Sequence, residues 1–166
     1  MKILFIRHSL AVNRHEFLGH DFDRPLTRRG VKRAFRFFEI MKIAYPKIDY
    51  IITSKALRAK QTAEVLRKFY KNAEYEETSL LLPGSGINEL KKVLNGKNGV
   101  VAIVGHEPDL SNMIKDIMHT PNLKIKLSKP SLVELEDEIL KNIFEYKQIK
   151  DIYEFCKNRR NSKKTK

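Results

Sequence analysis

Cysteine, long apolar runs and acidic residues are the features that this chain has least of. The single cysteine, Cys156, excludes an intramolecular disulfide and is typical of a reducing compartment. Charged residues interrupt every apolar stretch, so the sequence contains no candidate for a membrane-spanning helix. The apolar run Ile3–Ile6 meets Arg7 at once, which makes it too short for the core of a signal peptide. We therefore expect a cytoplasmic protein without membrane contact.

The shortage of acids leaves a formal net charge of +13, from 33 Lys and Arg against 20 Asp and Glu. Such an excess attracts anions of any kind, including nucleic acids, acidic proteins and phosphorylated metabolites. The basic residues are spread along the chain, with concentrations in residues 24–36 and 157–166. A solvated, lysine-rich surface is the simplest interpretation. Charge alone therefore does not identify a partner, and nucleic acid is not favoured.

The length of 166 residues fits one domain with a core of its own. We place this domain at residues 1–156 and expect residues 157–166 to form a flexible basic tail. Short apolar runs predict buried strands, and apolar residues at helical spacing predict helices between them. The predicted strands are Ile3–Ile6, Tyr50–Thr53, Tyr75–Leu81, Val100–Val104 and Ser131–Leu135.

The predicted helices follow four of these strands: one begins after the cap residue Thr27 and ends before Pro46, a second ends near Tyr70, a third covers Ile87 to Leu94, and a fourth begins near Pro108. Alternation of strands and helices predicts an α/β fold, a three-layer sandwich with a mainly parallel central sheet and helices on both faces. For the region Ile139 to Cys156 we predict a strand near Ile143 to Gln148 and then a C-terminal helix.

Polar residues that can bind an anion follow three of the predicted strands. Arg7 and His8 follow the first strand, Ser54 through Arg58 follow the second, and His106 follows the strand that ends at Val104. In an open α/β sheet, ligands bind outside the carboxyl ends of the strands. These side chains are therefore expected to meet in one anion-sized pocket that contains nucleophile candidates.

Four segments resemble the histidine phosphatase superfamily, and most of all its compact bacterial phosphohistidine phosphatases of the SixA type. They occur in the expected order and spacing up to about residue 115, and together they are far more specific than one Arg-His pair. The segments are Arg7-His8; Arg24-Pro25-Leu26-Thr27 with Gly30; Ser54 with Leu57-Arg58-Ala59 and Gln61-Thr62-Ala63; and Val104-Gly105-His106 with Pro108. The resemblance implies a phosphoglycerate-mutase-like fold and a metal-independent phosphatase with no cofactor.

The resemblance also implies roles for the residues. It assigns His8 as the nucleophile that carries the phosphoryl group and His106 as a phosphate ligand; the residues alone do not order the two. Phosphoryl transfer needs positioning and charge that complements the phosphoryl oxygens, and Arg7 and Arg58 offer planar donors that stay charged. His8 must be neutral at the attacking nitrogen and bonded at the other.

Three other residues in these segments have less defined roles. Ser9 stands where many relatives have glycine, and its hydroxyl is a candidate phosphate ligand. Arg24 is either a surface residue or part of the site, and Thr27 is either a helix cap or a ligand.

No carboxylate stands out as a general acid. Larger relatives supply one after the third strand, where this chain has Leu82-Pro83-Gly84-Ser85-Gly86. The weak candidates are Glu77, Glu89, Glu107 and Asp109. Because an imidazole leaves more readily than an alkoxide, a site without an acid suits phosphohistidine better than an ester.

The expected substrate is therefore a phosphorylated protein, such as a phosphohistidine phosphotransfer domain. Two alternatives stay open: the substrate is a small phosphomonoester, or the protein is a basic binding module with a vestigial site.

Motifs of other nucleotide-binding and metal-binding classes are absent from the sequence. It contains no P-loop and no dinucleotide fingerprint. His15, Glu16 and His20 have the wrong spacing for a zinc helix, and Cys156 has no neighbour at ligand spacing, so we expect no metal.

Overall fold

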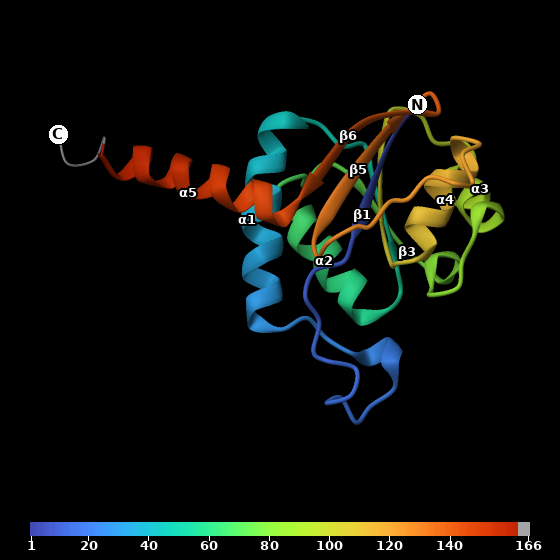
Figure 1. The fold of residues 1–166 in the computed structure, drawn as a ribbon, viewed down its shortest axis with the longest axis horizontal. Helices are drawn as coiled ribbons and strands as arrows, with labels where there is room; N and C mark the ends of the chain where they lie inside the picture. The colour runs from blue at the N-terminus through green and yellow to red at the C-terminus, as the bar shows by residue number, and fades with distance from the viewer. Residues whose placement is uncertain (163–166) are drawn as a thin grey trace.

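A six-stranded sheet forms the centre of the protein (Figure 1), whose computed structural model describes residues 1–162, with side chains described through residue 158. The strand order is β3-β2-β4-β1-β5-β6. The strands are β1 (Lys2–Arg7), β2 (Tyr50–Ser54), β3 (Glu74–Thr78), β4 (Val100–Gly105), β5 (Ser131–Glu136) and β6 (Ile139–Glu145).

The strand directions confirm a mainly parallel sheet. β1 pairs in parallel with β4, and β2 pairs in parallel with both β4 and β3. β5 runs antiparallel to β1, and β6 runs antiparallel to β5. The carboxyl ends of β1, β2 and β4 therefore share one edge of the sheet, and the amino end of β5 lies at that same edge.

Helices cover both faces of the sheet and complete the predicted three-layer α/β sandwich. On one face lie α1 (Arg28–Ala44), α2 (Leu57–Arg67) and α5 (Tyr146–Ser162); on the other lie α3 (Ile87–Leu94) and α4 (Asp109–Ile117). Short 3-10 turns occur at η1 (Asp21–Asp23) and η2 (Ser79–Leu81). Phe5, Phe37 and Phe38 are fully buried in these layers. Each such side chain contributes roughly 1.5–3 kcal/mol relative to an exposed position.

The helix expected after Thr27 begins where the sequence predicts. The Thr27 hydroxyl oxygen accepts a hydrogen bond from the Gly30 amide at 2.9 Å, which caps α1. Gly30 is required by a close approach, because a Cβ there would lie 2.0 Å from the carbonyl oxygen of Leu10. The cap interpretation of Thr27 is therefore confirmed.

The prediction for the late strand was wrong in position. β6 covers Ile139–Glu145, and Tyr146 and Gln148 already belong to α5. The cause is a tight hairpin: Asp137 and Glu138 have positive φ angles of 49° and 66° and reverse the chain directly after β5. Paired positive φ angles match the right-handed twist of the flanking strands. The alternation of Phe144, Tyr146 and Gln148 had placed the predicted strand too late in the sequence.

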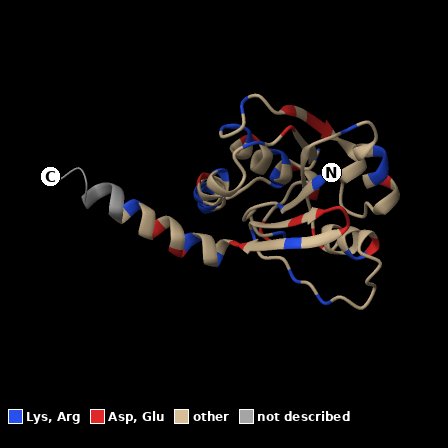
Figure 2. Ribbon diagram, turned by 90° about the horizontal axis from the view of Figure 1, so that it is seen from above, with Lys and Arg blue, Asp and Glu red and all other residues tan. Residues whose placement is uncertain are grey.

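The boundary expected at residue 156 falls inside α5, which continues to Ser162 and projects away from the sheet (Figure 1). Of the tail expected at residues 157–166, the last four lie outside the described residues. Figure 2 shows Lys and Arg on many elements rather than in one block, as the charge interpretation expects. Within the described part of the chain, no helix is long and apolar enough to cross a membrane.

Candidate active site

The carboxyl ends of the parallel strands bring the two candidate histidines together. The amide of His8, just after β1, donates to the carbonyl of Gly105 at the end of β4 at 3.1 Å. His106 follows Gly105, and the ring centroids of the two histidines are 5.3 Å apart. Both side chains are buried, at 4% and 3% exposure. The pairing of β1 with β4 therefore brings together two histidines that are 98 residues apart in the sequence.

The segments around the histidines are hydrogen-bonded to one another. The Ser9 amide donates to the Thr62 hydroxyl at 3.1 Å, and that hydroxyl donates to the carbonyl of Arg58 at 2.7 Å. The amide of Leu26 donates to the side chain of Gln61 at 2.7 Å. The loop after β1 and the first turn of α2 are thus held in a fixed relation.

His8 is held in one orientation by its neighbour. Its Nδ1 lies 2.7 Å from the carbonyl oxygen of Ser9. Because a carbonyl only accepts, the proton is on Nδ1 and the lone pair is on Nε2. Burial lowers the pKa of His8 well below its ordinary value, and the nearby His106, Lys129 and Arg58 lower it further. The ring is neutral near pH 7, as an attacking nitrogen must be.

His106 is bound on one side only. Its Nε2 lies 2.9 Å from the hydroxyl of Ser54 at the end of β2, and its Nδ1 is buried without a partner among the described residues. Burial, followed by the charge of Arg58, lowers the pKa of His106 to about 3. With the Ser54 hydroxyl as donor, the ring proton lies on Nδ1 and is available to an anion. A bound phosphoryl group would favour the charged ring.

Arg7 and Arg58 each have a buried Nε donor that no group in residues 1–158 binds. Arg7 Nη1 donates to the carbonyl of Leu127, and Arg58 Nη1 donates to the carbonyl of Asp21 at 2.7 Å. In the described part of the chain, the Nε atoms of both arginines are buried without a partner. Burial lowers the pKa of both guanidiniums. The four residues predicted as the catalytic set therefore lie in one place, and three of their nitrogens are buried without a partner among the described residues.

Asp21 is a site residue that the sequence analysis missed. Its carboxylate pairs with Arg58 Nη2 at 3.1 Å and with Arg24 Nε at 3.0 Å. Arg24 also donates to the carbonyl of Val12 at 2.7 Å, and its charge acts on His106. Arg24 thus belongs to the charged cluster of the site rather than to the free surface. In the sequence, the only sign of this ion pair is the spacing of three residues between Asp21 and Arg24.

Ser9 lies in the site, but its hydroxyl has a partner within the fold. The side chain is fully buried, and its Oγ donates to the carbonyl of Gly30 at 2.7 Å. Its carbonyl accepts from His8 Nδ1. Ser9 therefore acts on the site through its backbone and its packing; binding of phosphate by its hydroxyl stays a prediction.

The four candidate general acids all have hydrogen-bond or ion-pair partners within the fold, although burial raises the pKa of Asp109. Glu77 pairs with Lys60 at 3.2 Å, and Glu89 accepts from the Gly86 amide at 3.0 Å. Asp109 accepts from the Gly84 amide at 2.9 Å. Glu107 lies beside Arg7, whose pKa it raises against the effect of burial.

Glu107 also caps α4, since its two carboxylate oxygens accept from the amide of Ser111 at 3.2 Å and from its hydroxyl at 2.6 Å. The carboxylate beside Arg7 is therefore held by the first turn of α4.

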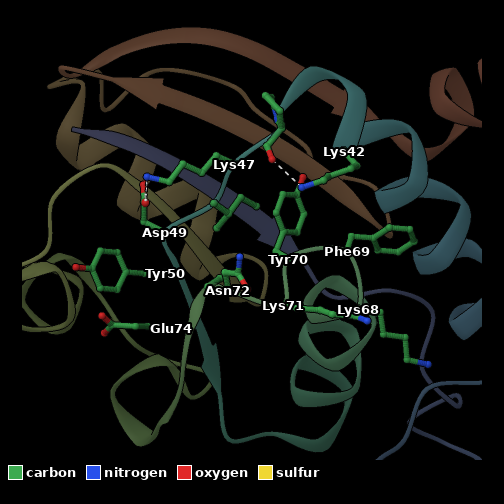
Figure 3. A pocket seen from close by; sticks show the side chains of 13 residues that line it. Lys42, Lys47, Asp49, Tyr50, Lys68, Phe69, Tyr70, Lys71, Asn72 and Glu74 are labelled. Carbon is green, nitrogen blue, oxygen red and sulfur yellow. Dashed lines mark hydrogen bonds and ion pairs between the residues drawn. The ribbon is translucent and has the colours of Figure 1, made fainter.

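A hollow of about 610 Å³ lies at the opposite edge of the sheet, near the amino ends of β2 and β3 (Figure 3). Two of its lysines have partners within the fold: Lys42 Nζ donates to the carbonyl of Pro46 at 2.7 Å, and Lys47 pairs with Asp49 at 2.6 Å. It contains neither histidine of the predicted set. In residues 1–158, no group of three or more His, Cys, Asp or Glu could hold a metal ion.

A family model for the histidine phosphatase superfamily (branch 1) matches residues 3–81, which contain Arg7, His8 and Arg58. This chain belongs to the histidine phosphatase superfamily. It is also 30% identical over 133 residues to an uncharacterized protein of Picosynechococcus sp., covering 75% of this chain and 80% of that protein. The resemblance inferred from the four segments is confirmed.

Several solved structures share the fold of this chain. The protein histidine phosphatase SixA in complex with tungstate superposes with a TM-score of 0.77 at 18% identity, over 90% of this chain and 99% of that one. SixA of Agrobacterium tumefaciens gives a TM-score of 0.75 at 18% identity, over 86% of this chain and 96% of that one. Phosphoserine phosphatase of Entamoeba histolytica gives 0.63 at 16% identity, over 87% and 97%. A phosphoglycerate mutase of Plasmodium falciparum gives 0.63 at 18% identity, over 85% and 88%, so the similarity establishes a phosphoglycerate-mutase-like fold.

The buried histidines of this superfamily member predict a loss of stability in acid. Both have lowered pKa values when folded, so the unfolded chain binds more protons below its ordinary histidine pKa. Stability is therefore complete above about pH 6.5 and falls as the pH decreases towards the folded values. For His106 the expected loss between about pH 7 and about pH 5 is about 2 kcal/mol.

Urea unfolding of the wild type and of His106→Asn at these two pH values measures this effect. The variant cannot gain the proton, so its stability should decrease less between the two. Equal decreases in both proteins would contradict a neutral, buried His106.

Proposed function

We propose that this member of the superfamily is a phosphatase that takes a phosphoryl group onto Nε2 of His8 and releases it to water, with phosphohistidine in proteins as its substrate. One observation supports this most: Arg7 Nε, Arg58 Nε and His106 Nδ1 are buried without partners among the described residues, and the ring of His106 lies 5.3 Å from that of His8. Unsatisfied buried donors are costly, and a phosphoryl group provides oxygens for all three.

The first step is a transfer between two nitrogens. The lone pair of His8 Nε2 attacks phosphorus, and the bond from phosphorus to the substrate imidazole breaks. When the other nitrogen of that imidazole carries a proton, it departs as neutral imidazole and needs no acid from the enzyme. The carbonyl of Ser9 accepts from Nδ1–H and so stabilises the positive charge that His8 acquires.

The second step returns the enzyme to its starting state. Water attacks the phosphorus, the bond to His8 Nε2 breaks, and the ring recovers its lone pair. The proton of the water leaves with the phosphate or passes to solvent. Throughout, Arg7, Arg58 and His106 offset the charge of the phosphoryl oxygens.

The partner follows from the chemistry of the leaving group and from the charge. With net charge +13, the protein favours an acidic partner such as a phosphotransfer domain. A small phosphomonoester is the alternative, and it would need a protonated acid near the leaving oxygen. Glu107 is the carboxylate beside Arg7, and both of its oxygens are bonded to Ser111. A cytoplasmic location of the protein is supported by its single cysteine, Cys156, which is free.

Release of inorganic phosphate from a phosphohistidine phosphotransfer domain, phosphoserine and 3-phosphoglycerate tests the substrate. We expect kcat/KM to be at least about 100-fold higher for phosphohistidine, because the esters lack an acid for their leaving group. Ready turnover of the esters without turnover of phosphohistidine would reject this substrate. Salt-dependent binding without any turnover would instead support a binding module.

A further inference from the structure

The segment before β5 ends at the active-site edge of the sheet. Ser131 is the register partner of Arg7 across the antiparallel pair, so the residues just before Ser131 lie beside the end of β1. Arg7 donates to the carbonyl of Leu127 in this segment, and Arg33 Nη1 donates to the carbonyl of Lys129 at 3.4 Å. The backbone around Lys129 is therefore fixed to the site from two sides.

Lys129 is half-buried and has no anionic partner. Among the described residues, no carboxylate lies within ion-pair distance of its ammonium. Three guanidiniums act on it instead: Arg7 from β1, Arg24 from the loop before α1, and Arg58 from α2. Burial, followed by these charges, lowers the pKa of Lys129, and its own charge acts on His8. An unpaired ammonium in such surroundings is unfavourable unless an anion joins it.

The charges around Lys129 favour an anion. Arg7, Arg24 and Arg58 all act on Lys129, and Arg14 acts on Arg58 as well, whereas Asp21 pairs with Arg58 and Glu107 acts on Arg7. Cations therefore outnumber carboxylates in this cluster, and a bound phosphoryl group would offset the repulsion on Lys129.

We propose that Lys129 is a further catalytic residue whose ammonium binds the phosphoryl oxygens during transfer to His8. This inference rests on the proposed function of the same site. It gives the enzyme a cation from the β5 side of the sheet, in addition to the family segments, which all precede residue 115. A cation placed where charge develops stabilises the transition state more than the ground state.

Substitution of Lys129 separates a catalytic role from a structural one. Lys129→Met is expected to lower kcat/KM for phosphohistidine by about 100-fold to 1000-fold, and Lys129→Arg should restore most of it. The affinity for tungstate, used as a phosphate analogue, should decrease in Lys129→Met. The stability of the ligand-free protein should stay equal or rise, because an unpaired cation is removed. Lys126→Met, an exposed lysine of the same segment, is the matched control and should change none of these values.

The pH profile gives an independent measurement. Deprotonation of Lys129 should produce an alkaline decrease of kcat/KM in the wild type, which Lys129→Arg should lack because arginine stays charged. Unchanged kcat/KM and unchanged tungstate affinity in Lys129→Met would overturn the inference, while loss of turnover in His8→Asn would still support the proposed function. If no substrate is turned over, the tungstate titration alone still decides the role of Lys129.

Discussion

Replacement of His8 by asparagine is expected to lower kcat by about 10,000-fold or more, since it removes the nucleophile on which both steps depend. In the wild type, the carbonyl of Ser9 accepts from His8 Nδ1, and the asparagine side chain retains an N–H donor for the same carbonyl. The anion site itself, formed by Arg7, Arg58 and His106, stays in place. Tungstate should therefore still bind to His8→Asn while phosphate release from phosphohistidine is lost.

A covalent intermediate gives the same prediction a direct readout. Wild-type protein quenched during turnover should carry an acid-labile, base-stable phosphoryl group on the peptide that contains His8, and His8→Asn should carry none. His15→Ala changes an exposed histidine of the following loop and is the matched control. Residual turnover near the wild-type rate in His8→Asn, or a phosphoryl group on another residue, would contradict the proposed nucleophile.

Replacement of Glu134 by glutamine is expected to lower the free energy of unfolding by about 3 kcal/mol without affecting turnover. Glu134 is 3% exposed on β5 and accepts from Tyr45 Oη at 2.7 Å, Asn142 Nδ2 at 2.6 Å and Lys2 Nζ at 2.7 Å. An amide cannot accept all three bonds, so buried donors lose their partner. This network lies near the amino end of β1, away from the histidines.

The matched control is Glu136→Gln, which removes a more exposed carboxylate 3.9 Å from the same Lys2 ammonium. Its expected effect is below about 0.5 kcal/mol. Urea unfolding near pH 7 measures both variants. Similar small effects for the two substitutions would show that the buried network does not stabilise the fold.

The effect of Glu134 should also depend on pH. Burial opposes its ionisation, but hydrogen bonds from Lys2, Asn142 and Tyr45 together lower its pKa. A lowered folded pKa means that the contribution is complete above the unfolded value and is lost as the pH falls through the folded value. The difference between wild type and Glu134→Gln should therefore decrease in acid below about pH 4.5.

Much of the fold and the centre of the site followed from local patterns. The buried strands at Ile3–Ile6 and Val100–Val104, with polar residues directly after them, predicted where His8 and His106 would lie. That prediction works because parallel strands place their carboxyl ends at one edge whatever the details of packing. The late hairpin was misplaced because β6 is an exposed edge strand, on which apolar alternation is weak and the Asp137-Glu138 turn decides the register.

The sequence by itself determined the α/β class and the family, and it predicted the set Arg7, His8, Arg58 and His106, because these depend on residue order and short spacings. Only the tertiary structure decided which nitrogen of His8 is free, that Ser54 holds His106, and that Asp21 pairs with Arg58. It also decided that Lys129 joins the site, since the antiparallel direction of β5 brings its amino end beside Arg7. Contacts between residues far apart along the chain depend on strand order and direction, which no local pattern contains.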